Sequence, residues 1–317
     1  MGRYIMRRLV QSVILLVLVT MIAFALMHLA PGGPLAVYTL NPTIRAEDIA
    51  RLEKSFGLDR PLYIQYAKWA SGMMRGDWGR SFRDSQPVFD IIVSRLWSTL
   101  VLAGTALVIA MVLGVFIGTL GAVRQHSVAD YLSTIGAMLA LSIPTFWFGL
   151  MAIYLFSVRL GWLPSGGRQT LGEDFSLADR IEHLILPASV LGFVLVATWS
   201  RYTRAAVLEI INQDFIRVAR SKGLSEKRVI TGHVMRNAMG PLVVLAGIQI
   251  PLLFSGALVT ESVFTWPGMG RLFVDSLNYR DYPVMMGILF VTAVLVILFN
   301  LLADIVGVLV DPRVRLN

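Results

Sequence analysis

Long apolar runs dominate this sequence, and its charged residues are confined to the stretches between them. Hydrophobic residues make up 56% of the 317 positions and charged residues 15%, with a mean hydropathy of +0.69. Each run is about as long as a helix that crosses a bilayer, where helices satisfy every backbone hydrogen bond internally. We therefore expect one all-α, polytopic membrane domain over residues 1–317, with six transmembrane helices at about 9–30, 99–123, 131–158, 184–202, 239–260 and 284–310.

The basic residues predict the orientation of this bundle. Three arginines precede the first run, two follow the last, and eight lysines or arginines lie between Arg201 and Arg236. Cytoplasmic loops are enriched in such residues, so we expect both termini and the loop at 203–238 to be cytoplasmic. The net charge of +8 reflects this topology and contact with membrane lipid. Nucleic acid is not expected as a partner, because the cations lie in short loops without interleaved aromatics.

Residues 31–97 are polar, with nine cations and seven anions, and predict a folded extracytoplasmic insert. One helix is expected from Ala46 to Phe56, ending at Gly57. A second is expected to use Asp59 as its N-cap, with Pro61 in its first turn. The insert either receives a partner or only covers the outer end of the bundle.

Two features inside the runs bear on helix packing. Small residues recur at every fourth position of the second run, which predicts a close contact with another helix: Ala110, Gly114, Gly118 and Ala122. Pro144 interrupts the third run. Such a break either lines a cavity or is a packed kink.

The basic loop itself predicts a helical hairpin. Phe215, Val218 and Ala219 are spaced at i, i+3 and i+4 after Asp214, a plausible N-cap, which predicts a short amphipathic helix. Gly223 follows it and suits a left-handed C-cap. Ser225, with Glu226 beside it, is then expected to begin a second short helix that runs toward His233.

Several stretches resemble one protein family. A-R-S-K-G-L (219–224) followed by H-V-M-R-N-A-M-G-P (233–241) resembles the cytoplasmic EAA loop of permease subunits of binding-protein-dependent ABC importers, closest to the peptide and nickel subfamily. Other stretches resemble that subfamily too: L-D-R-P-L-Y-I-Q-Y (58–66), G-D-W-G-R-S (76–81), E-x-x-F-x-W-P-G-x-G (261–270) and R-D-Y-P (280–283). The resemblance extends over nearly the whole chain and implies a type I permease fold.

This resemblance implies a set of partners. They are a homologous second permease subunit, two ABC ATPase subunits or domains, and a periplasmic or lipid-anchored solute-binding protein, in the plasma (inner) membrane of a bacterium or archaeon. It implies that the hairpin couples to an ATPase through Asp214, Phe215, Val218, Ala219, Gly223, Leu224, His233, Arg236 and Asn237. Arg217 stands where the general motif has glutamate, so no contact is transferred to it. The alternative is a basic tether held by anionic lipid.

Two other groups of residues are candidates. The resemblance implies an extracytoplasmic gate or a binding-protein contact at Glu261, Phe264, Trp266, Pro267 and Gly268. Asn300 and Asp304 form an intramembrane polar pair one turn apart. Acids within membranes are often functional, but we favour a hydrogen bond from this pair to a neighbouring helix.

The chain lacks the residues that other function classes require. It has no phosphate-binding G-x-x-x-x-G-K-[ST] loop, so ATP and Mg are expected on the partner subunits and no cofactor on this chain. It has no cysteine and four scattered histidines, so no metal site is expected. An intramembrane enzyme and a free-standing secondary carrier are the rival classes, but no nucleophile motif and no inverted repeat is visible.

Peptides are the expected cargo, with nickel or oligosaccharide as alternatives. The 14 methionines are spread along the chain, and they form no cluster with histidine that would capture a soft or borderline metal.

Overall fold

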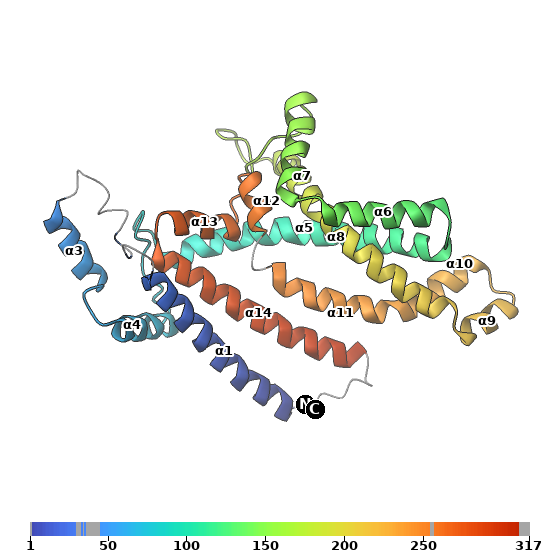
Figure 1. The fold of residues 1–317 in the computed structure, drawn as a ribbon, viewed down its shortest axis with the longest axis horizontal. Helices are drawn as coiled ribbons and strands as arrows, with labels where there is room; N and C mark the ends of the chain where they lie inside the picture. Colours follow the sequence, from blue (N-terminus) through green and yellow to red (C-terminus); the bar gives the residue numbers. More distant parts are fainter. Residues whose placement is uncertain (1, 30–32, 34, 36–44, 254–256, 311–317) are drawn as a thin grey trace.

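The computed structural model describes residues 2–29, 33, 35, 45–253 and 257–310, and nearly all of them are helical. Figure 1 shows the helices arranged as an elongated bundle with a short helical pair at each end. In chain order the elements are α1 (Gly2–Leu29), α3 (Ala46–Phe56), α4 (Leu62–Met74), α5 (Val88–Val123), α6 (Val128–Ser142), α7 (Thr145–Ala152), η1 (Ile153–Arg159), α8 (Leu177–Ile211), α9 (Asp214–Ser221), α10 (Glu226–Arg228), η2 (Val229–Val234), α11 (Met235–Leu253), α12 (Leu258–Val263), α13 (Met269–Asn278) and α14 (Tyr282–Val310).

Five of the described helices are long and apolar enough to cross a membrane, and a bent pair makes a sixth candidate. The all-α, polytopic fold predicted from the apolar runs is therefore confirmed. The bent pair consists of α6 followed by α7 and η1, which meet at an angle of 101°. Pro144 lies at this break and is the N-cap of α7. Because proline disfavours helical geometry in the residue before it, the third run forms a sharp turn instead of a straight span.

α5 and α8 form the closest helix pair, and the small residues of α5 explain why. A Cβ added at Gly118 would overlap the carbonyl oxygen of Ser200 and lie 2.7 Å from Cβ of Thr203. Gly114 approaches Trp199 equally closely. The close contact predicted from the small residues at every fourth position is therefore confirmed, and its partner is α8.

The long helices differ in extent from the predicted runs. α5 begins at Val88, well before Thr99, because the polar turns at its start are still helical. α8 continues past Tyr202 to Ile211 and so carries the fourth run directly into the basic loop. The run predicted at 239–260 is divided between α11 and α12, and residues 254–256 between them lie outside the described part of the chain.

The two helices predicted in the polar insert are present. α3 spans Ala46–Phe56, and its C-cap Gly57 has a left-handed backbone with φ +71°. The prediction that Asp59 caps the second helix is wrong. Pro61 occupies that position, and because its φ is already −52° the helix starts there without a side-chain cap.

Candidate functional site

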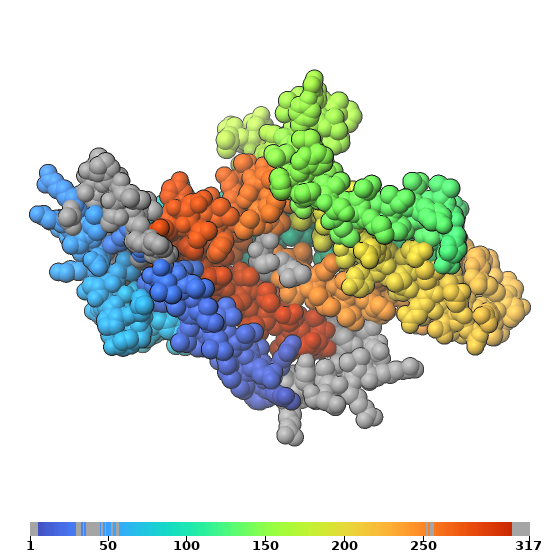
Figure 2. All heavy atoms as spheres, in the orientation of Figure 1, coloured from blue at the N-terminus to red at the C-terminus, as the bar shows by residue number. Residues whose placement is uncertain are grey.

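The basic loop folds as a compact helical hairpin at one end of the molecule. It consists of α9, followed by α10 and η2, and connects α8 to α11. In Figures 1 and 2 it forms the right-hand tip, coloured yellow to orange, at the far end of α8. We call residues 212–234 the coupling hairpin, after the role that the family resemblance implies for it.

The coupling hairpin is anchored to the ends of the long helices by an apolar cluster. Ile216 of α9 and Val229 and Val234 of η2 have no exposed surface. They pack with Ala122 at the end of α5 and with Val207 near the end of α8. Burial of this kind contributes about 1.5–3 kcal/mol for each large aliphatic side chain. The hairpin is therefore packed firmly against the ends of α5 and α8.

Two features close the hairpin. Gly223 adopts a left-handed backbone with φ +78°, as the sequence predicts, and reverses the chain between α9 and α10. Across this turn the Arg220 guanidinium donates two hydrogen bonds to the Glu226 carboxylate, at 3.1 and 2.7 Å. These bonds raise the pKa of Arg220 above its ordinary value. Both side chains are largely exposed, so the pair adds orientation more than stability.

The outer face of α9 combines exposed apolar and charged side chains. Phe215 is 44% exposed and Val218 is 51% exposed, although both are large hydrophobic residues on a short polar helix. Arg217 lies on the same helix and forms an exposed ion pair with Asp214 at 3.3 Å. An exposed apolar pair with a polar rim is the composition of a protein-binding patch.

The structure corrects the predicted anatomy of this helix. Asp214 is the first helical residue and Gln213 occupies the N-cap, without a side-chain hydrogen bond. Ser225 is in the N-cap position of α10, but its side chain also accepts no capping bond. Ala219 does not share a face with Phe215 and Val218, because it is buried with Ile216. The i, i+3 spacing of Ile216 and Ala219 was the sequence signal for this inner face.

The remaining candidates of the loop lie after the turn. Leu224 is half-buried and packs against the same apolar cluster. The backbone carbonyl of His233 accepts a hydrogen bond from the side-chain amide of Asn237, at 2.7 Å. Arg236 and Asn237 are exposed, whereas Ala238 beside them is buried against the cluster. These residues begin α11 and are set apart from the exposed face of α9.

A second ion pair ties α6 to α8 close to the hairpin. Arg204 donates from Nε and Nη2 to the two carboxylate oxygens of Asp130, at 2.7 and 2.9 Å. Asp130 also accepts the backbone N–H of His126, at 3.0 Å. The Asp130 side chain is 6% exposed and that of Arg204 is 30% exposed. This bidentate geometry fixes the start of α6 against the helix that carries the hairpin.

We expect Asp130→Asn to destabilise the purified protein by about 1–2 kcal/mol, because a charge-assisted, bidentate pair is lost while Arg204 keeps partial access to water. Thermal unfolding in detergent measures this change. Asp214→Asn is the matched control, since its ion pair with Arg217 is fully exposed, and it should leave the unfolding temperature unchanged. If both variants unfolded at the same temperature, a structural role for the ion pair between Asp130 and Arg204 would be contradicted.

The run at 261–270, which carries part of the family resemblance, forms a buried polar centre that joins three helices. Glu261 of α12 has no exposed surface. Its carboxylate accepts the hydroxyl of Thr99 on α5 at 2.7 Å and the backbone N–H of Arg271 on α13 at 3.0 Å. Thr99 in turn accepts the N–H of Met269 at 2.7 Å. The centre therefore holds α5, α12 and α13 together.

The two aromatic residues of this run are also buried. Phe264 and Trp266 are 0% and 1% exposed, and the Trp266 indole donates to the Ser98 carbonyl at 2.9 Å. Gly268 has no room for a side chain, because a Cβ there would overlap the Glu261 carboxylate. Pro267 is half-buried between them. In this arrangement the large side chains of the run pack inside the chain. The extracytoplasmic gate or binding-protein contact expected at this run stays a prediction.

Two other stretches that carry the family resemblance meet in space. Asp281, from R-D-Y-P, accepts the hydroxyl of Ser81 at 2.5 Å and the backbone N–H of Phe82 at 3.0 Å. Ser81 ends G-D-W-G-R-S, 200 residues earlier in the chain. Trp78 from the same stretch packs against α5 and α14. The two stretches thus form one joint between the polar insert and the start of α14.

One member of the polar pair in the last long helix, Asp304, faces α1. The Asp304 carboxylate lies 3.2 Å from the guanidinium of Arg8. Asp304 thus pairs with an arginine of a neighbouring helix. The hydrogen bond expected from the Asn300 and Asp304 pair as a whole stays a prediction. Among the described residues, no group of three or more histidines or acids is placed to hold a metal ion.

Comparisons with known proteins agree with this anatomy. A family model described as "Binding-protein-dependent transport system inner membrane component" matches residues 110–316, and the corresponding N-terminal model matches residues 1–103. The oligopeptide transport system permease protein AppB of Bacillus subtilis (strain 168) is 44% identical over 316 residues, covering 99% of this chain and all of that protein. The dipeptide transport system permease protein DppB of Escherichia coli (strain K12) is 38% identical over 336 residues, covering 99% of each chain.

The fold also matches a solved structure. An inward-facing structure of the MetNI methionine ABC transporter superposes with a TM-score of 0.58 at 20% identity, covering 72% of this chain and 99% of that chain. This likeness concerns the fold alone. The two family models span nearly the whole sequence, and together with the relatives at 44% and 38% identity they lead to one conclusion: the chain belongs to the family of inner membrane components of binding-protein-dependent transport systems, the permease subunits of ABC importers.

Proposed function

We propose that this chain forms half of a translocation pathway for peptides in an ATP-driven importer. Relatives with 44% and 38% identity are named oligopeptide and dipeptide permeases, and they match over their full length. In this proposal a solute-binding protein delivers the peptide outside, and a homologous but different permease subunit supplies the other half of the pathway. The complex resides in the plasma (inner) membrane of the cell.

The main support for this proposal is the packing of the coupling hairpin. Its inner face is locked to α5 and α8 through Ile216, while its outer face exposes Phe215 and Val218. This two-sided construction suits an element that inserts into a cleft of an ATPase subunit and moves the long helices with it. The ATPase must contact the hairpin differently in its two nucleotide states, since only a differential contact shifts a conformational equilibrium.

A reconstituted complex with its ATPase and binding-protein partners should show ATP hydrolysis stimulated by peptides. The physical reason is that cargo delivery favours one conformation of the permease, and the coupling hairpin transmits this preference to the ATPases. Phosphate release, measured with and without peptide, tests it. Stimulation by nickel complexes or oligosaccharides, and not by peptides, would move the cargo to one of those alternatives while leaving the transport role intact.

We expect reporter fusions near residues 60 and 170 to report from outside the membrane, and fusions near residue 220 from the cytoplasm. The expectation rests on the basic residues at the N-terminus and throughout the coupling hairpin. An extracytoplasmic signal from a fusion at Ser221 would contradict both the orientation and the contact with an ATPase.

A further inference from the structure

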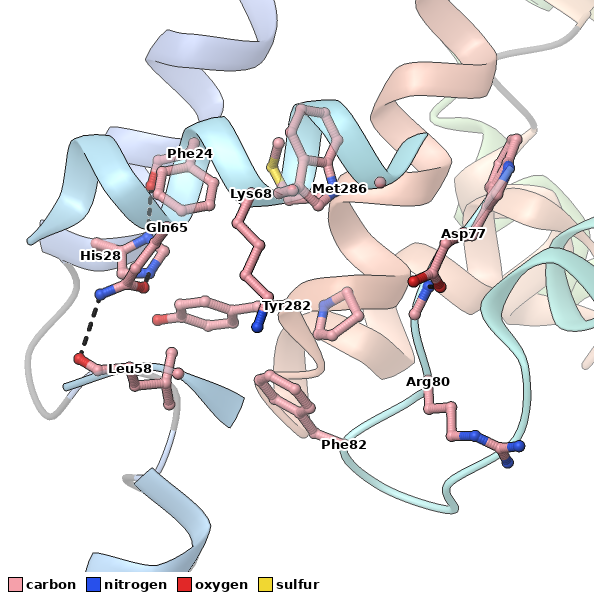
Figure 3. Close-up of a pocket in the computed structure, with 16 residues that line it drawn as sticks. Phe24, His28, Leu58, Gln65, Lys68, Asp77, Arg80, Phe82, Tyr282 and Met286 are labelled. Atoms are coloured by element: carbon pink, nitrogen blue, oxygen red, sulfur yellow. Dashed lines mark hydrogen bonds between the residues drawn. The ribbon is translucent and has the colours of Figure 1, made fainter. Parts of the chain in front are cut away.

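A cavity of about 460 Å³ lies where the end of α1, the polar helix α4 and the start of α14 meet. Figure 3 shows it between these helices and the loop that follows α4. Its lining comes from these four segments and from residues 57–58 before α4; Phe24, His28, Gln65, Lys68, Trp69 and Tyr282 are among the residues that form it. No residue of the coupling hairpin and no residue of the buried centre around Glu261 lines this cavity.

The walls of the cavity are aromatic, and the polar groups of His28, Gln65 and Tyr282 already have partners. His28 stacks on Phe24 at 4.2 Å between ring centroids and meets the edge of Tyr282 at 5.4 Å. The two nitrogens of His28 bond the Phe24 carbonyl and the side chain of Gln65, at 2.8 and 3.1 Å. These walls offer flat apolar surfaces and, at the indole N–H of Trp69, a buried donor without a hydrogen-bond partner among the described residues.

Lys68 differs from the other charged groups of the lining. Figure 3 shows its side chain extending from α4 into the space beside Tyr282. No ion pair or hydrogen bond joins its ammonium to another residue in the described part of the chain. The other charged residues of the lining are engaged nearby: Arg80 donates to the Ser85 carbonyl at 2.9 Å, and Asp77 accepts the Gly79 N–H at 3.1 Å. The cavity therefore suits a ligand with an apolar body and one anionic group.

The position of the cavity selects the kind of ligand. Two of the helices that line it, α1 and α4, also expose large apolar side chains, with Leu26 at 63%, Leu29 at 75% and Leu62 at 47% exposure. A bilayer lipid can therefore reach the cavity sideways along an apolar surface. In the proposed orientation the end of α1 lies at the outer membrane interface, where aromatic side chains and lipid headgroups meet. No residue of α5, α8 or α11 lines the cavity, so a peptide moving along those helices would not enter it.

We propose that this cavity binds an anionic phospholipid, with the headgroup phosphate on the Lys68 ammonium and the upper acyl chain against the aromatic wall. The bound lipid would fill the joint between the polar insert and the bundle. The proposal uses the orientation proposed above but does not depend on the nature of the cargo.

The test uses the assembled transporter in nanodiscs of phosphatidylglycerol and phosphatidylcholine, with a trace of photoactivatable phosphatidylglycerol. After proteolysis of the transporter, the fragments of this chain that carry the lipid label are identified by mass spectrometry. We expect labelling within residues 57–82, reduced about fivefold by Lys68→Gln, since one basic side chain near an anionic lipid surface contributes about 1 kcal/mol. Arg75→Gln is the matched control: Arg75 is an exposed cation at the end of the same helix but does not line the cavity.

Equal labelling of the Lys68→Gln and Arg75→Gln variants would overturn the proposal. Loss of the label on addition of inorganic phosphate would also overturn it, because the site would then hold a free anion. So would labelling of the same residues by a photoactivatable peptide in place of the lipid. Labelling does not depend on which leaflet supplies the lipid, so this result and the fusion test of orientation can fail independently.

Discussion

Gly223→Val is expected to abolish cargo-stimulated ATP hydrolysis and import while the protein remains in the membrane at near-normal amount. Gly223 has φ +78°, and no atom lies within 4 Å of the position where a Cβ would stand. The cost is therefore backbone strain of about 1–3 kcal/mol and not a collision. Relief of that strain would rotate α9 and move Phe215 and Val218 away from the ATPase. The long helices insert through their own hydrophobicity and should be unaffected.

Gly223→Asn is the control for this experiment. Asparagine tolerates a left-handed backbone better than other residues with a side chain, and the open surroundings leave room for it. It should retain most of the stimulation. Membrane amount by immunoblotting and phosphate release in proteoliposomes are the two measurements. Normal import by the valine variant would show that the hairpin geometry does not couple, and the loop would then be a basic tether on the lipid surface.

Gly118→Ala is expected to produce the largest loss of folded protein among single methyl additions in the long helices. The new Cβ would overlap the backbone oxygen of Ser200, and a backbone atom cannot rotate away as a side chain can. α5 and α8 would have to separate, at a cost of about 1–3 kcal/mol for overpacking. Because α8 leads into the coupling hairpin, the protein that still folds should also couple poorly. Thermal unfolding and monodispersity in detergent measure the first effect.

Gly104→Ala provides the matched control on the same helix. No atom lies within 4 Å of a Cβ at Gly104, so the added methyl meets open space. Alanine also has the higher helix propensity, so this variant should be neutral or slightly stabilising. If Gly118→Ala unfolded at the same temperature as Gly104→Ala, the close contact between α5 and α8 would be refuted.

Some tertiary features could be predicted because they leave a local signature. Gly57 and Gly223 stand where a helix must end in a left-handed residue, and both do so in the structure. The small residues Gly114 and Gly118 predict a close helix contact, but their spacing does not indicate that α8 is the partner. In each case the requirement is steric and acts on the residue itself.

Other features could not be predicted because they depend on which partner is near. Phe215, Val218 and Ala219 have the spacing of one helix face, but only the fold shows that Ala219 turns inward with Ile216 while the other two stay exposed. Helix caps are similar. Asp214 and Asp59 have suitable side chains, but neighbouring residues Gln213 and Pro61 occupy the capping positions.

The sequence by itself determined the class of this protein, because apolar runs of membrane length can satisfy their backbone only as helices, and because several short stretches match one family. Only the tertiary structure decided what those stretches do. Asp281 binds Ser81 across 200 residues, and Glu261 holds α5 against α12 and α13 from a fully buried position. A buried polar group needs hydrogen-bond partners, and the fold can supply them from residues far away in the sequence. The local spacing of residues therefore does not predict which partners these are.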